Sequence, residues 1–112
     1  TEQYHSSTGL RTEEWIEHWF HHFQIDMQHA PAAVTTIIDK AIAFIDERAE
    51  PMPGVAHAIS LCRQQHLAVG LATSSPLSLV KVVLEKLNLQ NTFDAITSAE
   101  HLPFGKPNPQ VY

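Results

Sequence analysis

The chain has 112 residues, 44% of them hydrophobic, and a formal net charge of -5 at pH 7. This hydrophobic content is ordinary for a globular domain, and the scattered Lys and Arg residues form no basic stripe, so the composition argues against nucleic-acid binding. The longest apolar run, at residues 67–72, is far shorter than the roughly 18 residues of a membrane-spanning helix. The single Cys62 cannot form an internal disulfide. We therefore expect a reduced, cytoplasmic protein with neither a nucleic acid nor a membrane as its partner.

The first half of the chain predicts two amphipathic helices with no strand between them. One helix is expected at residues 12–24, capped by Thr12, and the other at residues 31–48, with Pro31 in its first turn. Apolar side chains recur along the first helix at helical spacing, and we expect its aromatic rings to form a helical core in preference to a platform that stacks sugar rings. These side chains are Trp15, Ile16, Trp19, Phe20 and Phe23.

The second half has a different pattern, which begins after a predicted domain hinge at the prolines of residues 50–54. A short helix is expected at residues 55–62, followed by a strand at 67–72 whose unbroken apolar run is typical of coverage on both faces. A helix opening at Pro76 and a strand at residues 95–97 complete the order. Such alternation predicts a parallel sheet with helical crossovers, and ligands of such sheets bind at the carboxyl ends of the strands.

Two polar segments are expected to meet at that edge of the sheet. Thr73, Ser74 and Ser75 follow the first strand, where hydroxyls, amides and the positive end of a helix could hold an anion. The alternative is that Ser75 only caps the helix. Lys106 lies in a loop stiffened by glycine and proline after the second strand, although an exposed lysine there could also be a solvated charge. One strand, helix and strand separate Thr73 from Lys106, which favours a shared phosphate site.

Three ordered segments resemble motifs of the haloacid dehalogenase superfamily. They are PGV at residues 53–55, LATSSP at 71–76 and GKPNP at 105–109. The resemblance extends over the whole chain, more strongly from residue 51 onward, and is greatest to the sugar-phosphate phosphatase branch that includes β-phosphoglucomutase and the hexitol and 2-deoxyglucose-6-phosphate phosphatases. It implies an α/β fold in which residues 51–112 form part of a Rossmann-like core with a parallel sheet, preceded by part of a helical cap at residues 1–50.

The resemblance also implies roles for individual residues. Thr73 is expected to hydrogen-bond the transferring phosphoryl group, with Ser74 and Ser75 as neighbouring donors. Lys106 is expected to neutralise the phosphate and the nucleophilic carboxylate. Arg11 lies in the cap segment that faces the active site, beside a tight turn suggested by Gly9, and is expected to contact substrate.

The implied activity is Mg²⁺-dependent hydrolysis of small phosphate esters, such as sugar or sugar-alcohol phosphates, through an aspartyl-phosphate. The chain carries no Asp-x-Asp pair, since its aspartates stand alone at positions 26, 39, 46 and 94. We therefore expect the nucleophile and the Mg²⁺ ligands outside this chain, which starts at Thr1 like an excised interior segment, and we expect the isolated chain to be inactive. Gln110 departs from the aspartate that many relatives have there, which weakens any transfer of loop hydrogen bonds.

Several alternatives stay open at the level of sequence. A phosphomutase of the β-phosphoglucomutase type shares the same motifs, and a non-catalytic fragment or interaction module could self-associate through exposed sheet edges. A metal site at His18, His21 and His22 is less favoured than a polar helix face. No G-x-G-x-x-G follows a predicted strand, and the flanking glycines of a serine nucleophile elbow are missing, which disfavours dinucleotide binding and serine hydrolysis. The specific ester and the oligomeric state are not determined.

Overall fold

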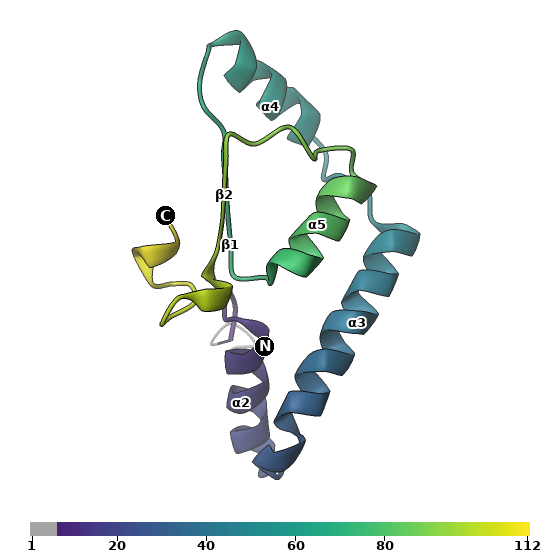
Figure 1. The fold of residues 1–112 in the computed structure, drawn as a ribbon, viewed down its shortest axis with the longest axis vertical. Helices are drawn as coiled ribbons and strands as arrows, with labels where there is room; N and C mark the ends of the chain where they lie inside the picture. Colours follow the sequence, from purple (N-terminus) through teal and green to yellow (C-terminus); the bar gives the residue numbers. More distant parts are fainter. Residues whose placement is uncertain (1–6) are drawn as a thin grey trace.

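The computed structural model describes residues 7–112, and residues 1–6 of the predicted cap lie outside the described residues. The first half is a helical hairpin in which α2 (Thr12–Phe23) runs antiparallel to α3 (Ala30–Arg48), joined through the short 3-10 helix η1 (Met27–His29) (Figure 1). Ile16 of α2 and Ala30 of α3 are buried in this half. Both predicted helices are confirmed, with boundaries within one residue of those expected.

The second half is a small α/β unit. It consists of α4 (Val55–Gln64), β1 (Gly70–Thr73), α5 (Leu77–Lys86) and β2 (Ala95–Ser98), followed by the 3-10 helices η2 (Ala99–His101) and η3 (Pro109–Val111). The two strands are parallel, and their register runs from Gly70 opposite Ala95 to Thr73 opposite Ser98. The predicted parallel pair with a helical crossover is confirmed.

Helix α5 connects the two halves because it lies between the sheet and α3 (Figure 1). Val80 and Leu84, one turn apart on α5, are each only 7% exposed and line pockets between α5 and the strands. On the other side of α5, Val82 lines a pocket together with Ile42 of α3. At the far end of the interface, Lys86 Nζ donates a hydrogen bond to the carbonyl of Asp46 at the end of α3. The helical hairpin therefore packs directly on the α/β unit.

The amino ends of the strands are joined by a carboxylate. Asp94 Oδ2 accepts from the Val69 amide at 2.7 Å and from Arg63 Nη1 at 2.8 Å. The Asp94 amide in turn donates to the Val69 carbonyl at 2.8 Å. Arg63 lies near the end of α4, so this cluster also ties α4 to the sheet.

Two expectations about the helical half were wrong in detail. The N-cap residue of α2 is Arg11 and not Thr12, and Glu14 accepts a hydrogen bond from the Arg11 amide at 2.9 Å in place of a cap by the Thr12 hydroxyl. A carboxylate three residues into a helix can reach back in this way, as in a capping box. Phe23 is not part of the core, since it is 63% exposed and stacks on Trp19 with ring centroids 5.6 Å apart.

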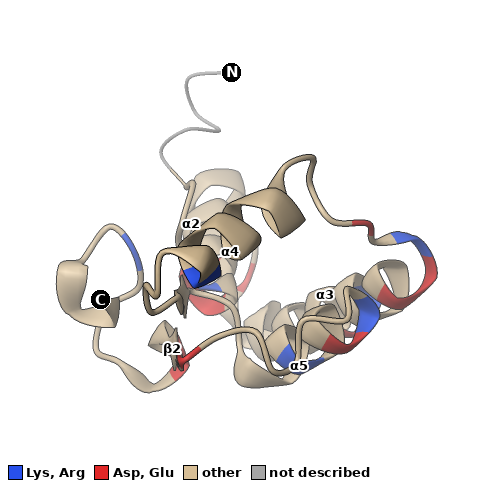
Figure 2. Cartoon of the chain, turned by 90° about the horizontal axis from the view of Figure 1, so that it is seen from above, with Lys and Arg blue, Asp and Glu red and all other residues tan. Residues whose placement is uncertain are grey.

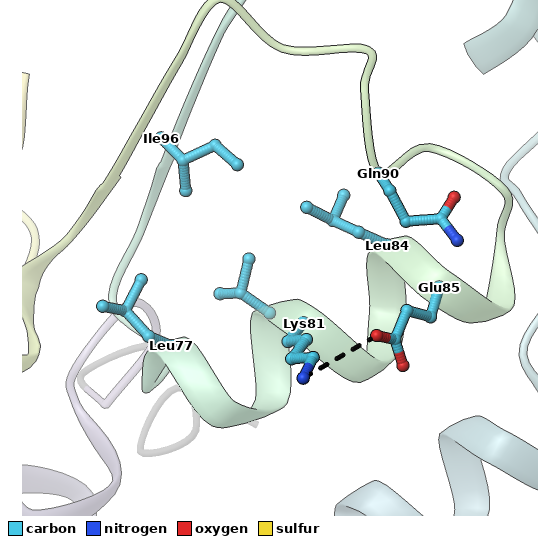
Figure 3. Close-up of a pocket in the computed structure, with 7 residues that line it drawn as sticks. Leu77, Lys81, Leu84, Glu85, Gln90 and Ile96 are labelled. Carbon is cyan, nitrogen blue, oxygen red and sulfur yellow. Dashed lines mark ion pairs between the residues drawn. The ribbon is translucent and has the colours of Figure 1, made fainter.

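The expected coverage of the sheet on both faces was also wrong for this chain. The regular strand starts only at Gly70, and Leu67 and Ile96 are 56% and 41% exposed. An open, mostly apolar groove of about 410 Å³ separates α5 from β2, lined by Leu77, Leu84 and Ile96 (Figure 3). Its rim carries the ion pair between Lys81 and Glu85, at 4.0 Å. Among residues 7–112, some apolar residues in and before the strands therefore stay partly exposed.

Charged residues of both signs lie along α3 and α5 (Figure 2). The last part of the chain, after Lys86, carries a single cationic side chain other than histidine, which is Lys106. No helix in the described part of the chain is long and apolar enough to cross a membrane.

Candidate functional site

The carboxyl ends of β1 and β2 are joined by a turn of hydroxyl residues. Thr73 ends β1, and the Ser75 amide closes the following turn by donating to Thr73 Oγ1 at 3.0 Å. Ser98, which ends β2, donates through its hydroxyl to the Ser75 carbonyl at 2.7 Å. The backbone of the turn is thereby fixed from both strands.

Lys106 reaches the same turn from the loop that follows η2. Its amide donates to Ser74 Oγ at 3.2 Å, and its ammonium donates to the Ala72 carbonyl at 2.8 Å. These partners flank Thr73 in the sequence. The structure therefore brings Lys106 together with Thr73 and Ser74, although they are separated by about one strand, helix and strand of chain.

This arrangement leaves hydrogen-bond donors at the sheet edge. Thr73 and Ser74 act as acceptors in these bonds, so each hydroxyl hydrogen can still donate. An ammonium has three N–H donors, and the Ala72 carbonyl occupies one of them. Donors and a cation held in place by backbone contacts suit an anion whose oxygens only accept, such as a phosphoryl group.

Ser75 does not cap α5, which corrects the alternative considered from sequence. The N-cap position is Pro76, without a side-chain cap bond, and the first helical amide, that of Leu77, donates to Glu100 Oε2 at 3.0 Å. The Ser75 side chain instead lines, together with Thr73, an otherwise apolar pocket of about 250 Å³ between β1 and α5. The positive end of α5 is thus matched by a carboxylate from the segment after β2.

Arg11 lies where α2 starts, close to the loop that carries Lys106. Its guanidinium donates to the Leu102 carbonyl at 2.7 Å, to the Pro103 carbonyl at 3.3 Å and to Glu14 Oε1 at 2.8 Å. The tight turn expected beside it is confirmed, because Gly9 adopts a positive φ of 85°. Arg11 is thus brought to the site region, but through contacts to protein oxygens, and its contact with substrate stays a prediction.

A pocket of about 420 Å³ opens beside Lys106, between the start of α2 and the loop. Its lining combines apolar side chains with a carboxylate, an amide and the lysine. The residues are Leu10, Glu14, Phe104, Gly105, Lys106, Pro107 and Asn108. Phe104 is 60% exposed. The pocket gives a small polar molecule room next to the cation.

Sequence reasoning missed Glu14 as part of this region and missed its contact with Gly105. The Gly105 amide donates to Glu14 Oε1 at 3.3 Å. The signal available for Glu14 was its position three residues after Arg11, the spacing of a capping box. Nothing in the sequence indicated that the same carboxylate also reaches a loop 91 residues away.

Metal ligands are a separate question, because the family resemblance implies Mg²⁺. Among residues 7–112, no three His, Cys, Asp or Glu side chains come together in a way that could hold a metal ion. The described residues therefore do not fit the Mg²⁺ site on their own. His18 and His22 lie edge-on to the Trp19 ring, with ring centroids 5.2 Å and 5.4 Å away.

Comparison with protein families assigns the class. The model of the haloacid dehalogenase-like hydrolases matches residues 2–112, and the chain belongs to this family. The mixed α/β fold, with its small parallel sheet and preceding helices, is that of part of such a domain.

Individual relatives narrow the resemblance. The chain is 39% identical over 93% of its length to the hexitol phosphatase B of Escherichia coli K12. It is 32% identical over 54% of its length to a phosphorylated carbohydrates phosphatase of Thermotoga maritima, and 29% identical over 75% to a phosphoglycolate phosphatase of Caulobacter vibrioides. The matches cover 47%, 28% and 35% of these relatives, so the chain spans half of their length or less.

Proposed function

We propose that the whole protein is a Mg²⁺-dependent phosphatase of small phosphorylated metabolites, and that its substrates are sugar or sugar-alcohol phosphates. Family membership supports the hydrolase class. The names of the hexitol and phosphorylated carbohydrates phosphatases support the substrate class. The nucleophilic aspartate and the Mg²⁺ ligands are proposed to lie outside these 112 residues, and the isolated chain is proposed to be inactive.

The observation that carries this proposal is the pair of contacts made by Lys106 on either side of Thr73. The ammonium is 2.8 Å from the Ala72 carbonyl and the amide is 3.2 Å from Ser74 Oγ. Phosphoryl transfer is catalysed mainly by positioning and by stabilising negative charge on the phosphoryl oxygens. A lysine fixed beside two hydroxyls supplies both requirements at the carboxyl end of a parallel strand, where such folds bind ligands.

We assign the following roles to these residues. Lys106 neutralises the phosphoryl oxygens, and the hydroxyl of Thr73 donates a hydrogen bond to one of them. Ser74 is a second donor, and Ser75 contributes to the turn that orients both. Arg11 contacts the substrate from the cap side of the site. Each donor is fixed before substrate binds, so little reorganisation is needed when charge develops.

The proposed division of the protein places the cap at residues 1–50 and the core at 51–112. The close approach of the start of α2 to the Lys106 loop supports it, since Glu14 and Arg11 contact that loop directly. A cap in this position would cover the pocket beside Lys106 and limit the access of water to it.

The test is a phosphate-release assay of the full-length protein on hexitol phosphates, hexose phosphates and phosphoglycolate, each with Mg²⁺ or with a chelator. We expect release from sugar or sugar-alcohol phosphates that depends on Mg²⁺. Absence of release from every ester in the presence of Mg²⁺ would refute the proposal. Isomerisation of a hexose 1-phosphate without free phosphate would instead assign the protein to the phosphomutases.

A further inference from the structure

Three hydrogen bonds tie the start of α2 to the segment just before Lys106, and a fourth joins their two α2-side residues to each other. Two come from Arg11, whose guanidinium donates to the carbonyls of Leu102 and Pro103 at 2.7 and 3.3 Å. A third runs from the Gly105 amide to Glu14 Oε1, at 3.3 Å, and the fourth joins Arg11 to Glu14, at 2.8 Å. We call Arg11 and Glu14 the clasp.

The clasp is shielded and charge-paired. The side chains of Arg11 and Glu14 are only 19% and 25% exposed. Burial alone would raise the pKa of Glu14, but hydrogen bonds from Arg11 and Gly105 outweigh burial, so this pKa lies below its ordinary value. Both members therefore carry their charge at neutral pH, and a planar guanidinium can serve Glu14 and two carbonyls at once.

Gly105 is needed for this close approach. A Cβ at position 105 would lie 2.6 Å from Glu14 Oε2 and 3.0 Å from Arg11 Cγ, so any other residue would require the Glu14 carboxylate to shift from its present position. Gly9 of the cap lies close to Lys106, since a Cβ added at Gly9 would lie 3.4 Å from Lys106 Cβ. The loop is held from the cap side immediately before the lysine.

On its other side, Lys106 is held by the turn after β1, through the Ser74 hydroxyl and the Ala72 carbonyl. The lysine therefore lies between the clasp and β1, and its position depends on both. A shift of about 1 Å in a catalytic group can lower the rate on the order of 100-fold, so the support of the loop matters for turnover.

We propose that Glu14, together with Arg11, is a positioning residue for Lys106: the clasp couples the cap helix to the Lys106 loop and sets where the ammonium lies. This inference rests on the proposed phosphatase function and adds to it that the cap helps to assemble the phosphate site. It assigns Glu14, a cap residue, an effect on turnover that it exerts only through Lys106.

The test compares Glu14→Gln with Glu17→Gln in the full-length protein. Both are glutamates of α2, and Glu17 is exposed and makes no hydrogen bond to the loop among those of residues 7–112. Glu14→Gln replaces one carboxylate oxygen, which accepts hydrogen bonds, with an NH₂ group, which can only donate. This NH₂ group would face the N–H donors of Arg11 or Gly105. We expect kcat to fall by at least about 10-fold while KM changes little, with no change for Glu17→Gln. Gly105→Ala should reproduce the loss of kcat because its Cβ displaces Glu14.

A double-mutant cycle separates positioning from a general loss of structure. Glu14→Gln is repeated in a Lys106→Arg background, which keeps a cation but not the position of the ammonium. If Glu14 acts through Lys106, Glu14→Gln should lower kcat much less in the Lys106→Arg background than in the wild type. Equal losses in both backgrounds, or a wild-type kcat in Glu14→Gln, would overturn the inference. A wild-type protein that releases no phosphate would instead refute the proposed function, so the two failures are distinguishable.

Discussion

At the amino ends of the two strands, polar groups bind one another, whereas at the carboxyl ends they keep unused donors. The Asp94 carboxylate takes hydrogen bonds from Val69 and Arg63 and joins strand, loop and helix. At the other end, Thr73 and Ser74 accept hydrogen bonds through oxygens whose own hydrogens stay available. Figure 1 shows the two ends at opposite extremes of the short sheet.

Polar residues with a structural role and those with a proposed functional role thus differ in whether the protein uses all of their hydrogen-bonding groups. A carboxylate stabilises the fold when its oxygens accept hydrogen bonds from donors of the protein itself. Hydroxyls and an ammonium fixed by their backbone contacts, with donors still unused, can bind an acceptor from outside. Substitutions at the two ends should therefore have different effects, on turnover at one end and on stability at the other.

The largest effect is expected for Lys106→Ala in the full-length protein. The proposed site loses its cation, so turnover of the preferred sugar phosphate should fall roughly 100-fold or more. The melting temperature should change little, because Lys106 makes only one side-chain hydrogen bond to the protein among those described. Lys81→Ala, which removes an exposed lysine of α5, is the control. Retention of wild-type turnover in Lys106→Ala would remove the basis of the proposed site.

A smaller loss is expected for Thr73→Val. The substitution keeps the shape and removes the hydroxyl, so turnover should fall on the order of 10-fold, since a neutral hydrogen bond contributes less than a charge-assisted one. Thr97→Val is the matched control, because Thr97 is an exposed residue of the neighbouring strand. The ratio of kcat/KM values measures the effect. Equal ratios for the two valine variants would mean that the Thr73 hydroxyl has no special role.

The amino end should respond in the opposite sense. Asp94→Ala leaves the Val69 amide and the Arg63 guanidinium without their carboxylate, so the melting temperature should fall while turnover at saturating substrate stays at the wild-type level. Thermal unfolding followed by circular dichroism and the phosphate-release assay give the two values. A loss of turnover without a loss of stability would show that the two ends do not differ as described.

The smallest effect is a pH dependence at the same residue. The pKa of Asp94 lies below its ordinary value near 3.8, first because of the hydrogen bond from the Val69 amide. Burial opposes this shift, and the hydrogen bond and charge of Arg63 add to it. A carboxyl group with a lowered pKa stabilises the folded state above its ordinary pKa and loses this contribution as the pH falls through the folded-state value.

Wild type and Asp94→Asn should therefore differ most in stability near neutral pH, and the difference should shrink below about pH 4. Chemical denaturation at a series of pH values measures this difference. A difference that grows on acidification would contradict the assigned hydrogen bonds.

The sequence predicted most of the secondary structure because the underlying signals are local. Helical spacing of Trp15 and Trp19, Pro31 in a first turn and the apolar run before Thr73 each act within a few residues. The parallel pairing also followed, because a strand, a helix and a strand in succession have few other arrangements. Family motifs at residues 71–76 and 105–109 indicated which residues would meet.

The errors concern interactions between distant segments. Phe23 fits the helical pattern of apolar side chains but is largely exposed in the described structure. Ile96 lies in a strand that was expected to be covered, yet its side chain is partly exposed. Ser75 has the right residue type for a cap, yet Glu100 from η2, just after the other strand, accepts a hydrogen bond from the first amide of α5. The contact between Glu14 and Gly105 depends on how the cap packs on the loop, which no local pattern encodes.

The most direct test of the central claim is a crystal structure of the full-length protein with Mg²⁺ and orthovanadate, which mimics a transferring phosphoryl group. We predict vanadate at the carboxyl end of β1, with its oxygens within hydrogen-bonding distance of Thr73 Oγ1 and Lys106 Nζ. Vanadate bound elsewhere, or bound with both groups turned away from it, would contradict the assignment of this edge of the sheet as the phosphate site.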